Sequence, residues 1–386
     1  MRPGGGFAAG VMPKPRYLAP WHRPELLAAR AALAARAEDA ADDGLTAAEL
    51  EALRGRPALY HCISRVVDRR FVLGAAEREQ FVAYMRLYER FCQVQVLSFC
   101  VMSNHFHLLL EVPAAPAGRG RDWSDERLLG HLACLYPEHK LREVRWWLRH
   151  FREQGDAAGA EALRESYLRR MWDLSQFMKT LKQRFARWHN REHGRKGTLW
   201  EERFRSVLVE DGHAARTIAA YIDLNPVRAG IVEDAKDYRW CSYGEAVAGK
   251  ARAREGLQRV LFGSERGDRS GTRAADTPSN WRQAAHRYRQ LLDAGLGRGK
   301  PRASVARGDR GAGVRQLSEA EALRCRVRYF IDGMAIGSQR FIERVFGLTR
   351  ARFGPKRRTG ARRLRRIDTT LRSLRDLRVD AVAAPG

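Results

Sequence analysis

Apolar side chains recur at strand or helix spacing between residues 58 and 247, and this pattern predicts a folded core. Short β-rich runs alternate there with longer stretches whose apolar positions recur every three or four residues. In chain order the pattern predicts a strand at 59–67, a helix at 77–91, a strand at 93–102, a turn at 103–104 and a strand at 105–112. A helix followed by two adjacent strands predicts an antiparallel α+β sheet.

The strongest helical pattern of the chain covers residues 172–191, where six apolar side chains fall on one face. Residues 194–210 predict a loop that leads into a strand. A further helix is predicted at 213–224, and it must end near Asn225 because Pro226 follows. Residues 114–170 are helical and mixed in charge, which indicates an insertion into the sheet domain.

The flanking parts of the chain differ from this core in composition. We expect a disordered start and helical extension at 1–57, the core domain at 58–247, and a basic Gly/Arg-rich linker with one helix at 248–317. Residues 318–386 predict a small basic helical region. Ser318 with Glu321 is a capping-box pattern that predicts a helix to about Phe330, and Ser338 predicts the start of a second helix through Phe346. With a turn at 332–337 between the two helices, this region resembles a helix-turn-helix.

Charge adds a polyanionic partner to this picture. The 386 residues carry a formal net charge of +26, and residues 251–386 hold about +19 of it. Lys and Arg that meet phosphates release condensed counterions, so nucleic acid is the expected partner. On this basis, removing residues 251–386 is expected to weaken DNA binding and leave the chemistry of the core intact.

No apolar run approaches the roughly 18 residues of a membrane span, and the N-terminus lacks the pattern of a signal peptide. None of the six cysteines forms a CxxC pair, which argues against a zinc ribbon. Scattered cysteines without a secretory signal suit reduced thiols. We therefore expect a cytoplasmic, nucleoid-associated protein without a membrane partner.

Two histidines form the first candidate for chemistry. His105 and His107 lie at i and i+2 of a predicted strand, so both side chains point to the same face. Neutral imidazoles held side by side can bind a divalent metal. Phe106, Leu108 and Leu110 form the opposite face and can pack on a core. Paired histidines on a half-buried strand can equally be packing residues.

Tyr221 and Asn225 form the second candidate, because a spacing of four residues places them on one helix face. A tyrosine can act as a covalent nucleophile, provided that a cation or base lowers the cost of ionising it. On spacing alone, a packing tyrosine with Asn225 as a helix cap remains the alternative. Neither Tyr238 nor Tyr243 has a side chain able to bind a metal at the same spacing.

Four short motifs in order give a resemblance to a known family. They are YHCISR at 60–65, MSNHFHLLLEV at 102–112, GTLWEERFRS at 197–206 and YIDLNPVRAGIV at 221–232, followed by DYRWCSY at 237–243. Together these segments resemble the REP-associated tyrosine transposases, which are single-tyrosine HUH endonucleases. The resemblance covers about residues 58–247. Ser103 stands where the family usually has proline, and serine also suits a turn.

The resemblance implies a ferredoxin-like antiparallel sheet with packed helices, extended by mainly helical N- and C-terminal segments. It implies that Tyr221 attacks single-stranded DNA next to a hairpin and forms a 5′-phosphotyrosine. His105, His107 and Asn225 would hold Mg²⁺ or Mn²⁺. Such proteins act as monomers or homodimers.

The expected DNA contacts are basic or aromatic side chains near these motifs. They are Arg65, Lys182, Arg184, Arg187, Trp200, Arg203, Arg205 and Arg228. Trp200 would stack an extruded base, although a tryptophan at this place is also typical of a core. A catalytically silent regulator that binds hairpin DNA or RNA is the alternative function.

Overall fold

The computed structural model describes residues 18–23, 25, 28, 53, 55–263, 278–298, 316–375 and 382–383. Most of the predicted N-terminal helical extension lies outside these residues, as do residues 264–277 and 299–315 of the predicted Gly/Arg-rich linker. No helix in the described part of the chain is long and apolar enough to cross a membrane.

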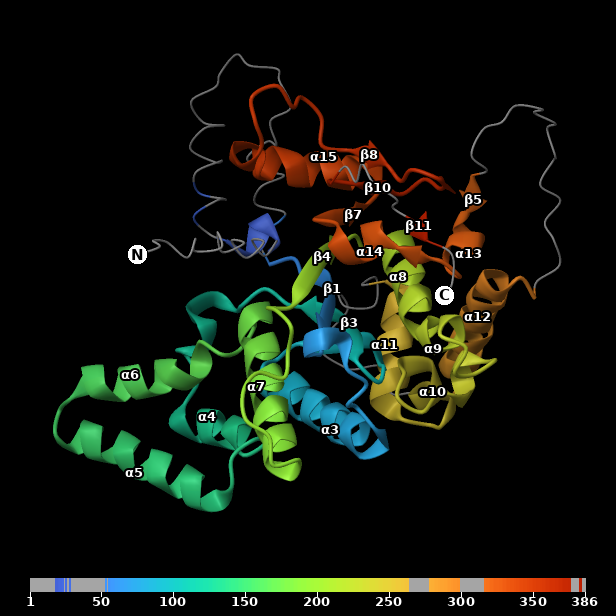
Figure 1. Cartoon of the computed structure of the whole chain (residues 1–386). Coiled ribbons are helices and arrows are strands. Elements are labelled where there is room, and N and C mark those ends of the chain that lie inside the picture. The colour runs from blue at the N-terminus through green and yellow to red at the C-terminus, as the bar shows by residue number, and fades with distance from the viewer. Residues whose placement is uncertain are drawn as a thin grey trace, which may run out of the picture.

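The centre of the molecule is a mixed sheet of seven strands in the order β2-β3-β1-β4-β7-β10-β8 (Figure 1). Its first four strands are antiparallel neighbours. The elements that form this half of the sheet are β1 (Ala58–Arg65), α3 (Ala75–Phe91), β2 (Gln95–Val101), β3 (His105–Val112), α7 (Leu174–Glu192) and β4 (Arg205–Val209). This βαββαβ sequence with β1 and β3 in the middle is the ferredoxin-like arrangement, and the α+β prediction is confirmed.

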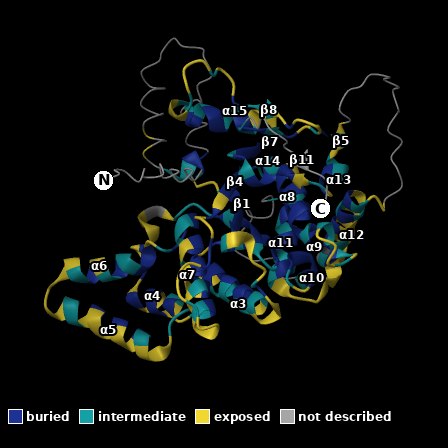
Figure 2. Ribbon diagram, in the orientation of Figure 1, coloured by how far each residue is buried: buried dark blue, intermediate teal, exposed yellow. Residues whose placement is uncertain are grey.

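Helices cover both faces of the sheet, and β3 contributes to both interfaces. Phe106, Leu108 and Leu110 belong to the core shared with α3 and α7, whereas Leu109 belongs to a second core on the opposite face. The helices of this second face are α8 (His213–Asp223), α9 (Asn225–Arg228), α10 (Ser242–Val247), α11 (Ala251–Phe262) and α12 (Pro278–Leu296). The buried residues in Figure 2 follow the same two layers.

Local sequence signals determine where the two main helices begin and end. The side chain of Asp173 accepts the backbone N–H of Gln176, so α7 begins at Leu174 rather than at residue 172. α8 ends at Asp223, and Pro226 lies in the first turn of α9. The proline therefore ends one helix and begins the next, and Asn225 opens the second.

The predicted helical insertion consists of α4 (Asp125–Leu132), α5 (Glu138–Glu153) and α6 (Ala157–Leu168). These helices extend away from the sheet on the side of α7 (Figure 1). Arg164 joins them to the preceding loop, because it is buried and bonds to the carboxylate of Asp125 at 2.5 Å and to the carbonyl of Trp123 at 2.6 Å. Short 3₁₀ turns lie at Pro20–His22, Val67–Arg69, Ala117–Gly120, Ala235–Asp237 and Arg350–Arg352.

The C-terminal elements join the same sheet, which the sequence did not predict. β7 (Ala335–Gly337) pairs in parallel with β4 through Leu208–Ala335 and Val209–Ile336, and it continues the sheet beyond its ferredoxin-like half. The other elements are β5 (Leu317–Ser318), α13 (Glu319–Ala322), β6 (Arg326–Val327), α14 (Arg328–Asp332), α15 (Gln339–Leu348), β8 (Arg362–Arg363), β9 (Ile367–Asp368), β10 (Arg372–Ser373) and β11 (Val382–Ala383).

The expected helix-turn-helix is therefore replaced by a mixed α/β segment. The capping box of Ser318 and Glu321 is present, but its helix ends at Ala322 and not near Phe330. Arg326 and Val327 are not helical, because their backbone pairs with that of Val382 and Ala383 as two short antiparallel strands. Ser338 caps α15 as expected, but the residues before it form β7 rather than a turn.

Side chains of the C-terminal segment also pack under the second face of the sheet. Tyr288 of α12 is fully buried, and its hydroxyl donates to the carboxylate of Asp223 at 2.6 Å. Tyr329, Phe330 and Ile331 of α14 are buried in the same core as α8. The described residues after 263 are consequently part of the core domain.

An ion pair between α8 and α13 is expected to make this packing depend on pH. His213 Nε2 lies 3.0 Å from Glu319 Oε2, and the hydrogen bond that His213 donates to Glu319 raises the pKa of His213. Burial raises the pKa of Glu319, but hydrogen bonds from His213 and two threonines bring that pKa below its ordinary value. The pair therefore makes its full contribution to the stability of the fold between about pH 4.5 and 6.5. Below this range Glu319 becomes protonated, and above it His213 loses its proton, so the stabilisation decreases on both sides.

The pair is partly exposed, so we expect it to contribute about 0.5–1 kcal/mol. The melting temperature of the full chain should fall as the pH rises from 6 to 8, and His213→Gln should reduce that slope. If the melting temperature of His213→Gln falls with pH as steeply as that of the wild type, the pH dependence arises from other groups.

Candidate active site

The histidine pair lies on the face of β3 that is covered by α8. The ring centres of His105 and His107 are 5.1 Å apart, and their planes are inclined by 80°. His107 is 3% exposed, whereas His105 at the strand end is partly buried. The expectation that both side chains share one face is met, but this face is covered and not open to solvent.

A third histidine completes the group, and the sequence analysis did not identify it. His61 lies on β1, which pairs with β3, and its Nε2 is 2.9 Å from Nδ1 of His107. The two rings stack with centres 5.1 Å apart. Its Nδ1 is 2.7 Å from the backbone carbonyl of Phe330, a residue of α14. His61 lies in YHCISR, but only the pairing of β1 with β3 brings it beside His107, because its register partner is Leu109.

Tyr221 approaches the same histidines from α8. Its ring centre lies 6.3 Å from that of His61 and 6.2 Å from that of His107, edge-to-face in both cases. Its side chain is 3% exposed and also packs against Phe330, with ring centres 5.0 Å apart. The fold thus brings together Tyr221 and the histidine pair, which are separated by more than 100 residues in the chain.

Arg228 places a positive charge on the tyrosine ring. Its guanidinium carbon lies 4.0 Å from the ring centre of Tyr221. One Nη donates to the carbonyl of Tyr221 at 2.8 Å and the other to the carbonyl of Leu323 at 2.9 Å. A cation at this position suits an incoming phosphate.

Asn225 opens α9, four residues after Tyr221. Its Nδ2 is buried without a hydrogen-bond partner. The two ends of an amide are assigned from their surroundings, so a half turn of the group would offer Oδ1 at the same place. In the part of the chain that the structure describes, no three His, Cys, Asp or Glu side chains gather as a metal site. An amide oxygen turned toward the histidine pair would be a third ligand of a kind that Mg²⁺ and Mn²⁺ accept.

The histidines are held neutral, as metal ligands must be. Burial lowers the pKa of His61 to about 4 and that of His105 to about 3, and it brings the pKa of His107 well below its ordinary value. Arg65, Arg228 and Arg326 lower the pKa of His105 further. These arginines also make the surroundings of the imidazoles positive, which suits an anionic phosphate.

The eight expected DNA contacts fall into separate groups. Arg65, Arg203 and Arg205 line a cavity of about 110 Å³ together with Arg69 and Arg326. Arg205 is already bonded there to Asp332 and Glu202. Arg228 lies against Tyr221, as described above. The remaining basic residues, Lys182, Arg184 and Arg187, lie on α7, which covers the opposite face of the sheet.

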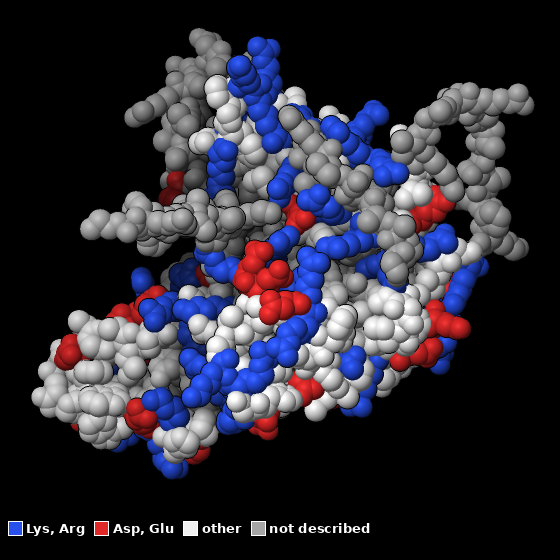
Figure 3. All heavy atoms as spheres, viewed as in Figure 1, with Lys and Arg blue, Asp and Glu red and all other residues white. Residues whose placement is uncertain are grey.

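The α7 group forms a different surface from the cavity beside the histidines. Arg184 and Arg187 line a cavity of about 450 Å³ with Arg169, Arg170 and Lys179. Lys182 is buried and donates to the carbonyl of Glu202 at 2.8 Å. Figure 3 shows Lys and Arg in a band across one face of the molecule, next to a group of acidic side chains.

Trp200 differs from its expected role. It is 8% exposed, packs among Phe81, Phe106 and Phe185, and donates its Nε1–H to the carbonyl of Lys182 at 3.1 Å. The apolar ring is therefore part of the core under α7, and it offers no face for stacking an extruded base. The alternative that the sequence left open, a core tryptophan, is what the structure contains.

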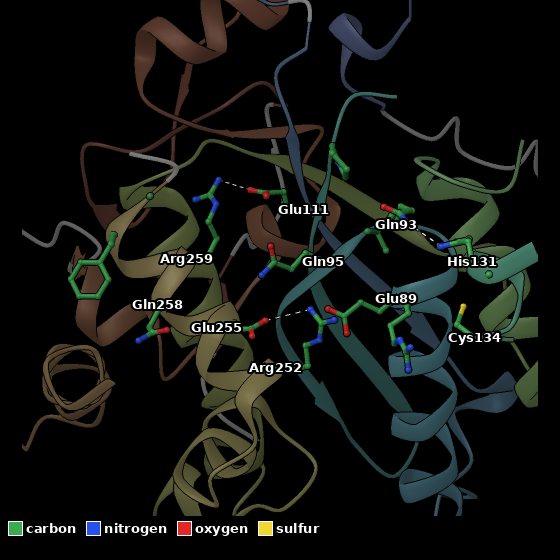
Figure 4. Close-up of a pocket in the computed structure, with 16 residues that line it drawn as sticks. Glu89, Gln93, Gln95, Glu111, His131, Cys134, Arg252, Glu255, Gln258 and Arg259 are labelled. Atoms are coloured by element: carbon green, nitrogen blue, oxygen red, sulfur yellow. Dashed lines mark hydrogen bonds and ion pairs between the residues drawn. The ribbon is translucent and has the colours of Figure 1, made fainter. Parts of the chain in front are cut away.

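A cavity of about 630 Å³ lies elsewhere, among α3, β2, α4 and α11 (Figure 4). Its carboxylates are engaged with arginines: Glu255 is 3.3 Å from Arg252, and Glu111 bonds to Arg259. None of the residues that line it belongs to the group around Tyr221. The candidate active site is consequently not the largest hollow of the molecule.

Residues 57–117 match the family model described as "Transposase IS200 like". The matched segment contains β1, α3, β2 and β3, and therefore His61, His105 and His107. The resemblance to the single-tyrosine transposases is thereby confirmed for this segment. The segment that carries Tyr221 lies outside the match.

One solved structure is also similar to the chain. It is described as the REP-associated tyrosine transposase bound to a REP hairpin, and it is 15% identical over 50% of this chain and 80% of its own, with a TM-score of 0.31. None of the curated proteins matches the chain.

Proposed function

We propose that this protein is a single-stranded DNA endonuclease and transposase that cleaves and rejoins DNA next to hairpin repeats. The observation that carries the proposal is the position of Tyr221, whose ring lies 6.2 Å from that of His107 and 4.0 Å from the guanidinium of Arg228. A tyrosine next to paired neutral imidazoles and a cation suits nucleophilic attack on a phosphodiester. The IS200-like match of residues 57–117 supports the same reaction class.

In the proposed step, the oxygen of Tyr221 forms a bond to the scissile phosphorus, and the bond from phosphorus to the 3′ oxygen breaks. The phenol loses its proton and the leaving 3′ oxygen gains one, so the products are a 5′-phosphotyrosine and a free 3′-OH. Reversal of the same step by another 3′-OH rejoins the strands. No nucleotide cofactor is required, because the covalent link conserves the phosphodiester bond.

His105, His107 and Asn225 are the residues that would hold Mg²⁺ or Mn²⁺, which would polarise the phosphate as a Lewis acid. Arg228 would contribute positive charge toward the phosphate from its place on the Tyr221 ring, and Arg65 would do so beside His105. Of the expected DNA contacts, Arg65, Arg203, Arg205 and Arg228 remain proposals for the site, and Lys182, Arg184 and Arg187 for the surface of α7.

A single assay tests the proposal. The full chain is incubated with single-stranded hairpin DNA and Mn²⁺, then denatured, digested and analysed by mass spectrometry. We expect a covalent nucleotide adduct on the peptide that contains Tyr221. Cleavage without an adduct, or an adduct on another tyrosine, would contradict the assignment.

The burial of Tyr221 favours one alternative, a protein that binds hairpin DNA or RNA without cutting it. Its side chain is 3% exposed under α14, so a phosphate can reach it only after a local movement. Retained hairpin binding without cleavage or adduct, at any Mn²⁺ or Mg²⁺ concentration, would support this silent regulator and reject the enzyme.

A further inference from the structure

Two chains of hydrogen bonds end at backbone carbonyl groups and pass through the histidines of the candidate site. In the first chain the carbonyl of Phe330 meets Nδ1 of His61 at 2.7 Å, and Nε2 of His61 meets Nδ1 of His107 at 2.9 Å. In the second chain the carbonyl of Arg69 meets Nδ2 of Asn104 at 3.0 Å, and Oδ1 of Asn104 meets Nδ1 of His105 at 2.6 Å.

The first chain determines where the proton of each ring lies. A carbonyl oxygen can only accept, so Nδ1 of His61 must carry its hydrogen. A neutral imidazole has one N–H, so Nε2 of His61 is an acceptor. Nδ1 of His107 must then be the donor, and the lone pair of His107 lies on Nε2. The ring of His61 is neutral, because it is fully buried and an imidazolium is costly in such a place.

The second chain gives His105 the same state by a different route. The carbonyl of Arg69 accepts from the amide nitrogen of Asn104, and this identifies the other end of the amide as oxygen. That oxygen accepts from Nδ1 of His105, which leaves the lone pair on Nε2. Arg69 itself has a φ of 54°, an unfavourable conformation for a residue other than glycine, so its carbonyl is placed by a distinctive turn.

We propose that His61 and Asn104 are positioning residues that hold His107 and His105 in the Nδ1-protonated tautomer, so that both rings present an Nε2 lone pair to a metal ion. The proposal rests on the proposed function and adds two residues to it. It also makes the backbone of Phe330, in the C-terminal segment, part of the machinery of the site. Partners of this kind orient a ligating imidazole and raise its basicity.

The tautomers can be measured directly in the metal-free full chain by ¹⁵N NMR of histidine side chains. Wild type is expected to show the Nδ1-protonated form at both His105 and His107. His61→Phe should convert His107 to a mixture of tautomers and leave His105 unchanged. Asn104→Ala should do the reverse, so each variant serves as the control for the other.

Binding of Mn²⁺, followed by electron paramagnetic resonance of the free ion, gives a second readout. His61→Phe is expected to weaken binding by 10- to 100-fold. His61→Gln should restore much of it, because an amide can donate to the carbonyl of Phe330 and accept from His107. The positioning role of His61 would be rejected if His107 stays Nδ1-protonated in His61→Phe. Equal Mn²⁺ affinity of His61→Phe and His61→Gln would reject it as well.

These outcomes are separate from the fate of the proposed function. If the wild type forms the Tyr221 adduct but the tautomer of His107 does not change in His61→Phe, only the positioning role of His61 is rejected. If the tautomers change as expected and no adduct forms, the proposed enzyme activity is rejected. His61 and Asn104 would then still orient the two histidines for metal binding.

A different observation carries a second inference, on the insertion helix α5. Trp146 and Trp147 are 54% and 40% exposed, and they are two of the five most exposed large apolar side chains in the described residues. Each already stacks on an aromatic ring one turn later: Trp146 on His150 with planes 4° apart, and Trp147 on Phe151 with planes 30° apart. Figure 2 shows that the outer side of α5 is exposed along its length.

Arginines surround these two stacks. Arg142 lies one turn before Trp146, and Arg149 one turn after it, and both are exposed. In the described part of the chain neither forms an ion pair, whereas Arg145 and Arg152 are paired with Glu138 and Asp125. Ordered aromatic stacks beside unpaired cations complement the bases and phosphates of a single strand.

We infer that this face of α5 binds single-stranded DNA, with bases extending the stacks of Trp146 and Trp147. The test is the affinity of the full chain for an unstructured oligothymidine at two salt concentrations. Trp146→Ala with Trp147→Ala should weaken binding at least tenfold, since stacking contributes about 5- to 150-fold per base. The double substitution to Phe should retain most of it, and Arg142→Gln with Arg149→Gln should reduce the salt dependence.

The matched control is Val247→Ala, which truncates another exposed apolar side chain, 45% exposed, on α10. Equal affinity of wild type and the double alanine variant would overturn the inference. Loss of self-association in sedimentation experiments, with unchanged DNA affinity, would identify the face as a contact between two copies of the chain.

Discussion

Replacement of Tyr221 by phenylalanine should reduce the covalent adduct with hairpin DNA by roughly three orders of magnitude or more, as expected for loss of a nucleophile. The ring remains in place, because its contacts with His61, His107, Phe330 and Arg228 are made by carbon atoms and the ring face. Loss of one hydroxyl changes the free energy of unfolding by about 1 kcal/mol. The adduct is measured on denaturing gels, and the fold by thermal denaturation.

The rival tyrosines provide matched controls for this substitution. The hydroxyl of Tyr238 donates to the carbonyl of Val101 at 2.8 Å and accepts from Arg78 at 2.8 Å. Tyr243 packs against Tyr288, and its hydroxyl accepts from Arg289 at 3.3 Å. Tyr238→Phe and Tyr243→Phe should therefore keep the adduct. If the adduct still forms in Tyr221→Phe but is lost in Tyr238→Phe, the nucleophile is Tyr238 and not Tyr221.

Removal of residues 264–386 should prevent the remainder from folding as a stable unit. Tyr288, Tyr329, Phe330, Ile331 and Ile336 are each at most 4% exposed in the core under α8. Their burial contributes roughly 10 kcal/mol at about 1.5–3 kcal/mol per side chain, which is comparable to the total stability of a domain. The truncated chain should show no cooperative melting transition, low solubility and no adduct.

This outcome is the opposite of what the charge distribution alone indicated, namely a detachable region that holds DNA. A point substitution in the full chain tests the same packing without removing any residues. Tyr288→Phe keeps the ring in the core but removes its bond to Asp223, so it should melt at a lower temperature and still fold. A chain of residues 1–263 that melts cooperatively and forms the adduct would restore the earlier interpretation.

Local patterns of the sequence predicted the parts of the fold that depend on neighbours in the chain. β3 begins at His105 and ends at Val112 as expected, because a turn at Ser103-Asn104 precedes it and Pro113 follows. The end of α8 near Asn225 followed from the constraint that Pro226 places on the residue before it. His105, His107 and Tyr221 were singled out by spacing and motif, and the structure places them together.

Features that depend on distant pairing could not be found in this way. His61 became part of the site only through the register of β1 and β3, which pairs it with Leu109 and so places it diagonally beside His107. β7 has three residues, too few to show a period, and its partner β4 is more than 120 residues earlier. Trp200 followed the family motif, but its environment in the core was set by Phe81 and Phe185 on two different helices.

The parallel pairing of β4 with β7 has a consequence for the synthesis of the protein. Strand β4 is complete when residue 209 leaves the ribosome, but its outer edge has no partner until β7 follows at residues 335–337. During that interval the edge presents unpaired N–H and C=O groups, which invite pairing with other chains. His61 waits longer still, because the carbonyl that bonds to it is 269 residues further along the chain.

Each nascent chain therefore passes through a stage with an open sheet edge and an uncovered tyrosine. Translation at about 5–20 residues per second makes this stage last on the order of ten seconds. Chaperones that shield exposed strand edges should accordingly have the greatest effect on the yield of this protein while residues 210–337 are being made.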